Sequence, residues 1–121
     1  MKNTMIIRTK QFALDCWFLS SKFPKSREFN AYINQLIRCS SSVGANYRAS
    51  QRAKSTADFI NKLKIVEEET DETQYFLELL IEVNDNNTLN HEIEKLIKES
   101  QELLSIIVAS IITARKNNNL K

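Results

Sequence analysis

Apolar side chains recur at helical spacing in four segments of the chain, and this pattern predicts four helices. The expected helices cover about residues 6–22, 28–51, 55–83 and 88–116, with residues 117–121 left as a frayed tail. In the first segment the largest apolar residues share one face, which we expect to be buried: Ile7, Leu14, Trp17 and Phe18. In the third segment the expected buried seam is apolar at both ends and polar in the middle: Phe59, Leu63, Val66, Thr70, Thr73, Leu77 and Leu80.

The ends of these segments carry residues that helix termini favour. Pro24 ends the first helix, because proline disfavours helical geometry in the residue before it and donates no backbone hydrogen bond. Ser26 is placed to cap the second helix. Ser55-Thr56-Ala57-Asp58 matches a capping box at the start of the third, and Asn87 or Thr88 is placed to cap the fourth.

The chain contains one glycine and one proline among 121 residues. Because β-hairpins and tight bends use these residues at each reversal, the count favours a few long helices over a β architecture. A chain of this length is expected to form a single domain over residues 1–121. Short connections make sequential helices antiparallel, so we expect an all-α, up-down-up-down four-helix bundle.

The fourth segment is apolar around more of its circumference than a bundle core requires. Its apolar residues between Leu103 and Ile112 spread over about 240°, whereas a core-facing stripe is only somewhat wider than 100°. A single chain is not expected to cover them all, so we predict a homo-oligomer interface at Ile106, Val108 and Ile112. The alternative is a helix buried more deeply within a monomer.

The net charge of +2 conceals a sharp division along the chain. Residues 1–64 carry twelve basic and three acidic side chains, for a net charge of +9, while residues 65–121 carry five basic and twelve acidic ones, for −7. The basic part can neutralise phosphates, and the acidic part can repel nucleic acid and so orient it. The expected RNA-binding residues form one cluster at the second turn and one at the first, at opposite ends of the bundle: Arg48, Arg52, Lys54 and Lys62, then Lys22, Lys25 and Arg27.

An alternative role for these basic residues is solubility or pairing with acids. Antiparallel pairing about Ala53 brings Arg38 level with Glu69, and Arg48 level with Asp58. We expect these two to be structural ion pairs, with Arg38 neutralising a partly buried carboxylate on the polar seam. Arg52, Lys54 and Lys62 therefore remain the preferred RNA contacts.

Residue types that carry catalysis or metal binding are sparse in this sequence. His91 is the only histidine, and the two cysteines, Cys16 and Cys39, form no C-x-x-C pair. The Glu-x-x-His motifs of di-metal bundles and the phosphate-binding glycine loops are missing as well. We therefore expect no catalytic residue, no metal, no cofactor and no enzymatic activity. No run of about 18 apolar residues and no signal peptide is visible, so we expect a cytoplasmic protein without membrane contact.

Several phrases between Phe12 and Leu80 resemble one bacterial family, the four-helix-bundle proteins encoded inside intervening sequences of 23S ribosomal RNA genes. They are Val43-Gly44-Ala45-Asn46-Tyr47-Arg48-Ala49, Arg52-Ala53-Lys54-Ser55, Asp58-Phe59-Ile60 and Tyr75-Phe76-Leu77-Glu78-Leu79-Leu80, with Lys22-Phe23-Pro24 and Gln35-Leu36-Ile37-Arg38 before them. The last helix resembles the family only in length and apolar pattern. Many relatives carry a glutamate where this chain has Ala49, so a role for that acid does not transfer.

The resemblance implies a closed bundle, a ring-shaped homo-oligomer, expected to be a homopentamer, and an association with RNA. Together with the charge pattern, it predicts a non-enzymatic, ribosome-associated scaffold that binds structured RNA, such as fragmented or insertion-bearing 23S rRNA, by phosphate contacts and shape. The alternative is an adaptor that binds another protein, as the similar accessory subunits of retroelement reverse transcriptases do. The two hypotheses differ in the salt dependence of RNA binding.

Overall fold

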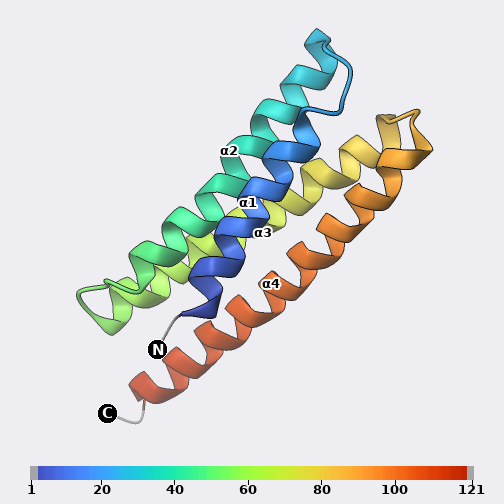
Figure 1. Ribbon diagram of the computed structural model, residues 1–121. Helices are drawn as coiled ribbons and strands as arrows, with labels where there is room; N and C mark the ends of the chain where they lie inside the picture. Colours follow the sequence, from blue (N-terminus) through green and yellow to red (C-terminus); the bar gives the residue numbers. More distant parts are fainter. Residues whose placement is uncertain (1–2, 120–121) are drawn as a thin grey trace.

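The computed structural model describes residues 3–119, which form four α-helices and no strand. The helices are α1 (Thr4–Ser20), α2 (Arg27–Ser50), α3 (Thr56–Val83) and α4 (Asn87–Asn119). Figure 1 shows them as an antiparallel bundle in which α1 contacts α2 and α4, and α3 contacts the same two helices from the other side. The expected all-α four-helix bundle is confirmed. Because α1 and α3 occupy diagonal corners, their outer faces point in opposite directions.

The predicted caps begin two of the helices. The Ser26 hydroxyl accepts a hydrogen bond from the Phe29 N–H at 3.1 Å, and the Ser55 hydroxyl accepts one from the Asp58 N–H at 3.0 Å. The Asp58 carboxylate in turn accepts the Lys54 N–H at 3.1 Å, one residue before the cap itself. These bonds satisfy backbone donors that the first turn of a helix leaves without intrahelical partners.

Helix α4 differs from the prediction at both ends. Its first turn is capped by Asn86, whose side-chain oxygen accepts the Thr88 N–H at 2.9 Å, so the expected cap at Asn87 or Thr88 is wrong. At the other end, residues 117–119 are helical rather than frayed, while residues 120 and 121 lie outside the described part of the chain. No glycine or proline follows Lys116 to stop the helix, and Lys116 itself, in the last turn, favours the negative dipole end of the helix.

The hydrophobic core has two clusters. The larger one includes Phe12, Leu36 and Leu77, and the smaller one includes Val43 and Leu63. Along α2 and α3 the two clusters are separated by buried hydroxyl residues that bond to carbonyls of their own helices: Ser40, Thr70 and Thr73. The α3 seam is therefore apolar at both ends and polar in the middle, as predicted, except that Phe59 is only partly buried.

The expected buried face of α1 is wrong. Its large apolar residues Ile7, Leu14, Trp17 and Phe18 are exposed, and the helix buries Thr9, Phe12, Cys16 and Leu19 instead. The buried set also follows a 3–4 spacing, but two of its members are small and weakly apolar. At Gly44 of α2 an added Cβ would lie 3.3 Å from the Thr9 Oγ1, so the glycine allows α1 and α2 to approach closely along this face.

Candidate nucleic-acid interface

Four predicted RNA-binding residues lie together where α2 ends and α3 begins. Arg48, Arg52, Lys54 and Lys62 line one surface depression, with Asp58 beside them. Arg48, Arg52 and Lys54 are exposed, and none of them forms an ion pair with another residue in the range 3–119. This end of the bundle therefore presents cations that stay available to an anionic ligand.

Lys62 is partly neutralised within the depression. Its Nζ lies 2.7 Å from the Asp58 carboxylate, one turn earlier on α3. The hydrogen bond from Lys62 and the Lys54 backbone N–H lower the pKa of the Asp58 carboxyl below its usual value. The predicted pair of Arg48 with Asp58 does not form, because the cap and the Lys62 pair hold this carboxylate at the start of α3.

Arg38 contacts two acidic residues of α3. Its guanidinium lies 3.5 Å from the Glu69 carboxylate, the predicted partner, and 2.6 Å from that of Glu72. Burial is the largest effect on Glu69 and raises the pKa of its carboxyl, although the Arg38 charge opposes the shift. Arg38 therefore acts between helices and is not part of the exposed basic end.

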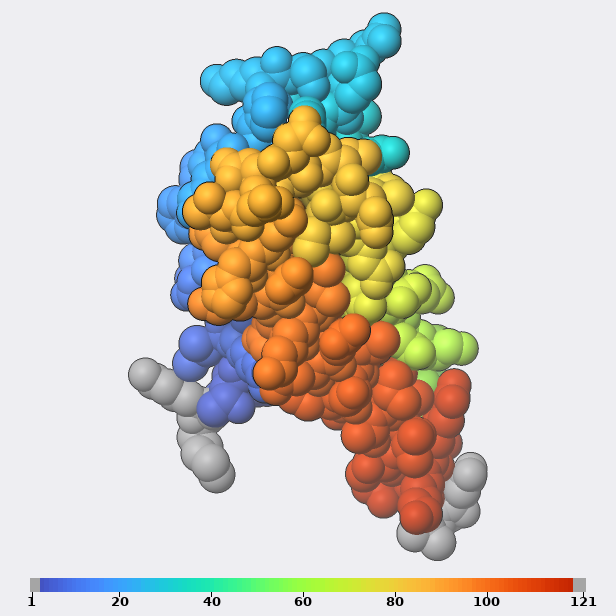
Figure 2. Space-filling model, turned by 90° about the vertical axis from the view of Figure 1, so that its right-hand side faces the viewer, coloured from blue at the N-terminus to red at the C-terminus, as the bar shows by residue number. Residues whose placement is uncertain are grey.

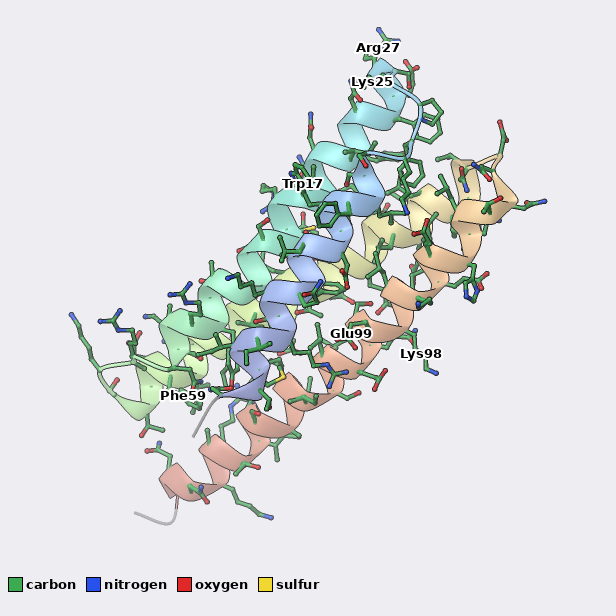
Figure 3. The ribbon with its side chains drawn as sticks, in the orientation of Figure 1. Trp17, Lys25, Arg27, Phe59, Lys98 and Glu99 are labelled. Carbon is green, nitrogen blue, oxygen red and sulfur yellow. The ribbon has the colours of Figure 1, made fainter. Side chains whose placement is uncertain are left out.

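The other basic cluster lies at the opposite end of the bundle, near the α1–α2 connection. Figure 3 shows Lys25 and Arg27 there, far from Phe59 at the start of α3. Lys22 pairs with Glu92 of α4 at 2.6 Å, and Arg27 pairs with the adjacent Glu28 at 3.0 Å. Two of the three predicted cations are thus matched by carboxylates, which makes this end the weaker candidate for phosphate binding.

Sequence reasoning missed two basic residues, Arg115 and Lys116 near the C-terminal end of α4. Figure 1 shows that this end of α4 lies on the same end of the bundle as the α2–α3 connection. A groove joins the start of α3 to the end of α4 and is lined by Phe59, Ala114 and Asn117, among others. Figure 2 shows α4, in red, extending past the start of the shorter α1, in blue. The expected antiparallel order already implied this position, because it places the C-terminal ends of α2 and α4 beside the N-terminal ends of α1 and α3.

Arg8 forms an ion pair that the sequence did not predict. Its Nε and Nη2 atoms bind the two carboxylate oxygens of Glu99 at 2.7 and 2.6 Å, and Glu102 lies 3.5 Å away. The hydrogen bond to Glu99 is the main cause of a raised pKa of the Arg8 guanidinium. Figure 3 shows Glu99 on the side of α4 that faces α1, so the pair links these two helices. Arg8 and Glu99 are 91 positions apart, so no local pattern relates them.

Comparison with known proteins identifies the relatives of this chain. The family described as 23S rRNA-intervening sequence protein matches residues 1–109. The chain belongs to this family. A crystal structure of a protein of unknown function from the S23 ribosomal protein family of Bacteroides thetaiotaomicron is similar, with 30% identity and a TM-score of 0.77. The match covers 88% of this chain and 96% of that one. No curated protein matches the chain.

The buried thiols of this intervening-sequence protein are poor nucleophiles. Burial raises the pKa of Cys16 to about 12 and also raises the pKa of Cys39, so both thiols stay protonated at neutral pH. Within residues 3–119, no group of three or more His, Cys, Asp or Glu side chains is arranged to hold a metal ion. The described helices also include none that is long and apolar enough to span a membrane.

The predicted interface residues of α4 do not share one face in the intervening-sequence protein. Ile106 lines the groove beside Phe59, Val108 is partly buried, and Ile112 is 58% exposed. Leu103, Ile107 and Ile111 fill the core of the chain itself. Much of the wide apolar arc is thus covered within the chain itself, and Ile112 is the one large side chain of this arc that remains exposed.

Proposed function

We propose that this intervening-sequence protein is a non-enzymatic, homo-oligomeric, cytoplasmic scaffold that binds structured RNA, with 23S rRNA carrying or fragmented at an intervening sequence as its target. The observation that supports RNA binding most directly is the group of exposed, unmatched cations Arg48, Arg52 and Lys54 at one end of the bundle. Arg115 and Lys116 extend the same charged end from α4. Some cations elsewhere, such as Arg8 and Lys22, pair with carboxylates, while others, such as Lys10 and Lys64, are exposed singly.

Binding by this end would depend on phosphate contacts and on RNA shape. The side chains are long, flexible cations, which suit phosphates and carry little base specificity. Apart from Asp58, the acidic residues of α3 and α4 lie between Glu67 and Glu102, away from the basic end, and would repel RNA from the rest of the bundle. Self-association would place several basic ends on one assembly, and linked sites bind more tightly than any one alone.

The test compares charge reversal at the two ends of the bundle. The variant Arg52→Glu/Lys54→Glu should weaken binding to a 23S rRNA hairpin by about tenfold or more and flatten the log–log salt slope by about 1–2. The matched control Lys25→Glu/Arg27→Glu should change both quantities much less. Equal losses in the two variants would contradict the assignment to the α2–α3 end. RNA binding that is absent, or insensitive to salt, would contradict the proposed function itself.

A protein-binding adaptor is the second candidate function. One observation favours it, namely the exposed apolar surface of α1 around Trp17 and Phe18, because exposed patches of this kind are typical of protein interfaces. In that case the protein would bind its partner with little dependence on salt. The salt series above therefore separates the two functions.

A further inference from the structure

A groove between α1 and α2 continues from the basic end along the side of the bundle. It shares Ile6, Ala45 and Arg48 with the depression that holds the exposed cations at the α2–α3 connection. Its volume is about 770 Å³, within the range of clefts that hold small ligands. A molecule bound at the basic end can therefore extend into this groove without leaving the protein surface.

The lining of the groove combines positive charge with small residues. Its charged residues are Lys10 and Arg48, and both are exposed. Neither forms an ion pair within the described part of the chain, and no acidic residue of that part lines the groove. On the α2 side, Ser41, Gly44 and Ala45 leave room for a ligand to approach the helix closely. The groove therefore suits a narrow, negatively charged chain.

Trp17 extends this surface along α1 toward the α1–α2 connection (Figure 3). At about 100° per residue it lies on the same side of α1 as Ile6, Lys10 and Ala13, which line the groove. Its side chain is 55% exposed. At 1.5 Å rise per residue it lies roughly 10 Å beyond Lys10. An edge-to-face contact with Phe18, with ring centroids 5.2 Å apart, holds the indole in place.

Unpaired RNA is bound in many proteins by this combination of groups. Cations along a groove contact the phosphates, and aromatic rings stack on bases that are free of a duplex. We propose that the α1–α2 groove holds an unpaired stretch of the RNA whose structured part binds the basic end, and that Trp17 stacks on one of its bases. The inference rests on the proposed function and specifies its RNA as a duplex with an unpaired end.

The charge of the groove favours RNA over a protein partner as its occupant. An RNA backbone is negative along its whole length, so it matches a groove that has cations and no acids. The groove is also continuous with the cations that support RNA binding at the basic end. A protein partner would instead need acidic side chains opposite Lys10 and Arg48 as well as apolar ones opposite Trp17.

The test uses the fluorescence of Trp17, which is the only tryptophan in the sequence. The probes are a blunt RNA duplex and the same duplex with a 3′ tail of about six uridines, an unpaired segment that allows stacking. The tailed duplex should bind about tenfold more tightly and quench the Trp17 emission, because a stacked base adds affinity and contacts the indole directly. The blunt duplex should bind at the basic end and leave the emission unchanged.

Three variants locate the binding of the tail. Trp17→Leu should abolish the gain in affinity from the tail, whereas Trp17→Phe should retain part of it, because a phenyl ring still stacks. Lys10→Gln should reduce the gain and lower the log–log salt slope for the tailed duplex by about 0.7. Tyr75→Leu is the matched control, since it removes an aromatic side chain that is 56% exposed on α3. Circular dichroism shows whether each variant remains folded.

The contrary outcomes separate this inference from the proposed function. Equal affinity for the two duplexes, with unquenched Trp17 emission, would overturn the inference and leave RNA binding at the basic end standing. A gain from the tail that survives Trp17→Leu, or that is lost in Tyr75→Leu, would also overturn it. So would the emission of a water-excluded indole before RNA is added, because a protein chain would then cover the site. If neither duplex bound, the proposed function would fail as well.

Discussion

At the scale of single residues, Gly44 decides how closely two helices approach. It lies within α2, where glycine is less favourable than alanine by about 1 kcal/mol. The space that a Cβ would fill is taken by Thr9, whose Oγ1 lies 3.3 Å and whose backbone lies 3.5 Å from the ideal Cβ position. The backbone of α1 cannot move aside without displacing Phe12 and Cys16 from the core.

We expect Gly44→Val to lower the free energy of unfolding by about 1–3 kcal/mol, because the two methyl groups would force α1 and α2 apart. The helix propensity of valine is slightly better than that of glycine, so a loss would report the clash and not the helix itself. Urea unfolding followed by circular dichroism measures the change. Ala31→Val, at an exposed position of the same helix, is the control and should have a small effect.

At the scale of helices, the first turn of α3 contributes both to the stability of the fold and to the basic end of the bundle. The Asp58 carboxylate accepts a hydrogen bond from the Lys54 N–H and pairs with Lys62, and both contacts require its ionised form. Its pKa in the folded protein therefore lies below the value in the unfolded chain. The stability that this group adds is present above the unfolded pKa and is lost as the pH falls through the folded pKa.

We expect Asp58→Asn to be less stable than the wild-type protein at neutral pH, and the difference to shrink as the pH falls below about 4. The measurement is urea unfolding of both proteins across a series from neutral to acidic pH. Asp85→Asn is the control, since it removes the same charge from the exposed α3–α4 connection, and Asp85 forms no ion pair within residues 3–119. A difference that persisted unchanged in acid would mean that Asp58 contributes by packing and not by charge.

At the scale of the whole molecule, the packing of the bundle is uneven around its circumference. Helix α1 spans 17 residues and α4 spans 33, so much of α4 extends beyond the helix beside it. Arg8 of α1 pairs with Glu99 of α4, and Lys22 in the α1–α2 connection pairs with Glu92 of the same helix. Helices α1 and α4 pack against each other less extensively than α2 and α3 do, so ion pairs make up a larger share of the contact between α1 and α4.

We expect Arg8→Met to reduce stability by about 1 kcal/mol or less, because the side chain is 36% exposed and solvent screens part of the pair. Hydrogen exchange should show faster opening of α1, with little change in α2 and α3. High salt should reduce the difference between the two proteins. Lys98→Met, at an exposed position of α4, is the matched control. Equal acceleration in all four helices would show that α1 does not open separately.

Patterns that act within one helix were predictable from the sequence. Apolar spacing located all four helices, and the hydroxyls of Ser26 and Ser55 cap the helices where the capping pattern placed them. The polar centre of the α3 seam was visible as Thr70 and Thr73. Each of these features depends on residues within a few positions of one another, where the geometry of a helix is already known.

The candidate site was only partly predictable. The sequence located the basic cluster at the α2–α3 connection, and the spacing of Asp58 and Lys62, four positions apart on one helix, already allowed the pair that occupies Lys62. It could not tell that Lys22 is occupied by Glu92, 70 positions away. It also missed Arg115 and Lys116, which only the antiparallel path of α4 brings to the same end. Pairs such as Lys22 with Glu92 depend on distances between side chains that lie far apart in the chain, and periodicity does not contain that information.

The amino-acid sequence by itself determined that this chain forms long helices, where most of them begin, and that positive charge precedes negative charge along it. Only the tertiary structure decided which face of α1 is buried. Hydrophobicity alone favoured Trp17 and Phe18, yet Gly44 offers a close contact that only the smaller Thr9 side of α1 can occupy. The physical reason is that close packing rewards fit between facing surfaces, and that fit is a property of two helices together.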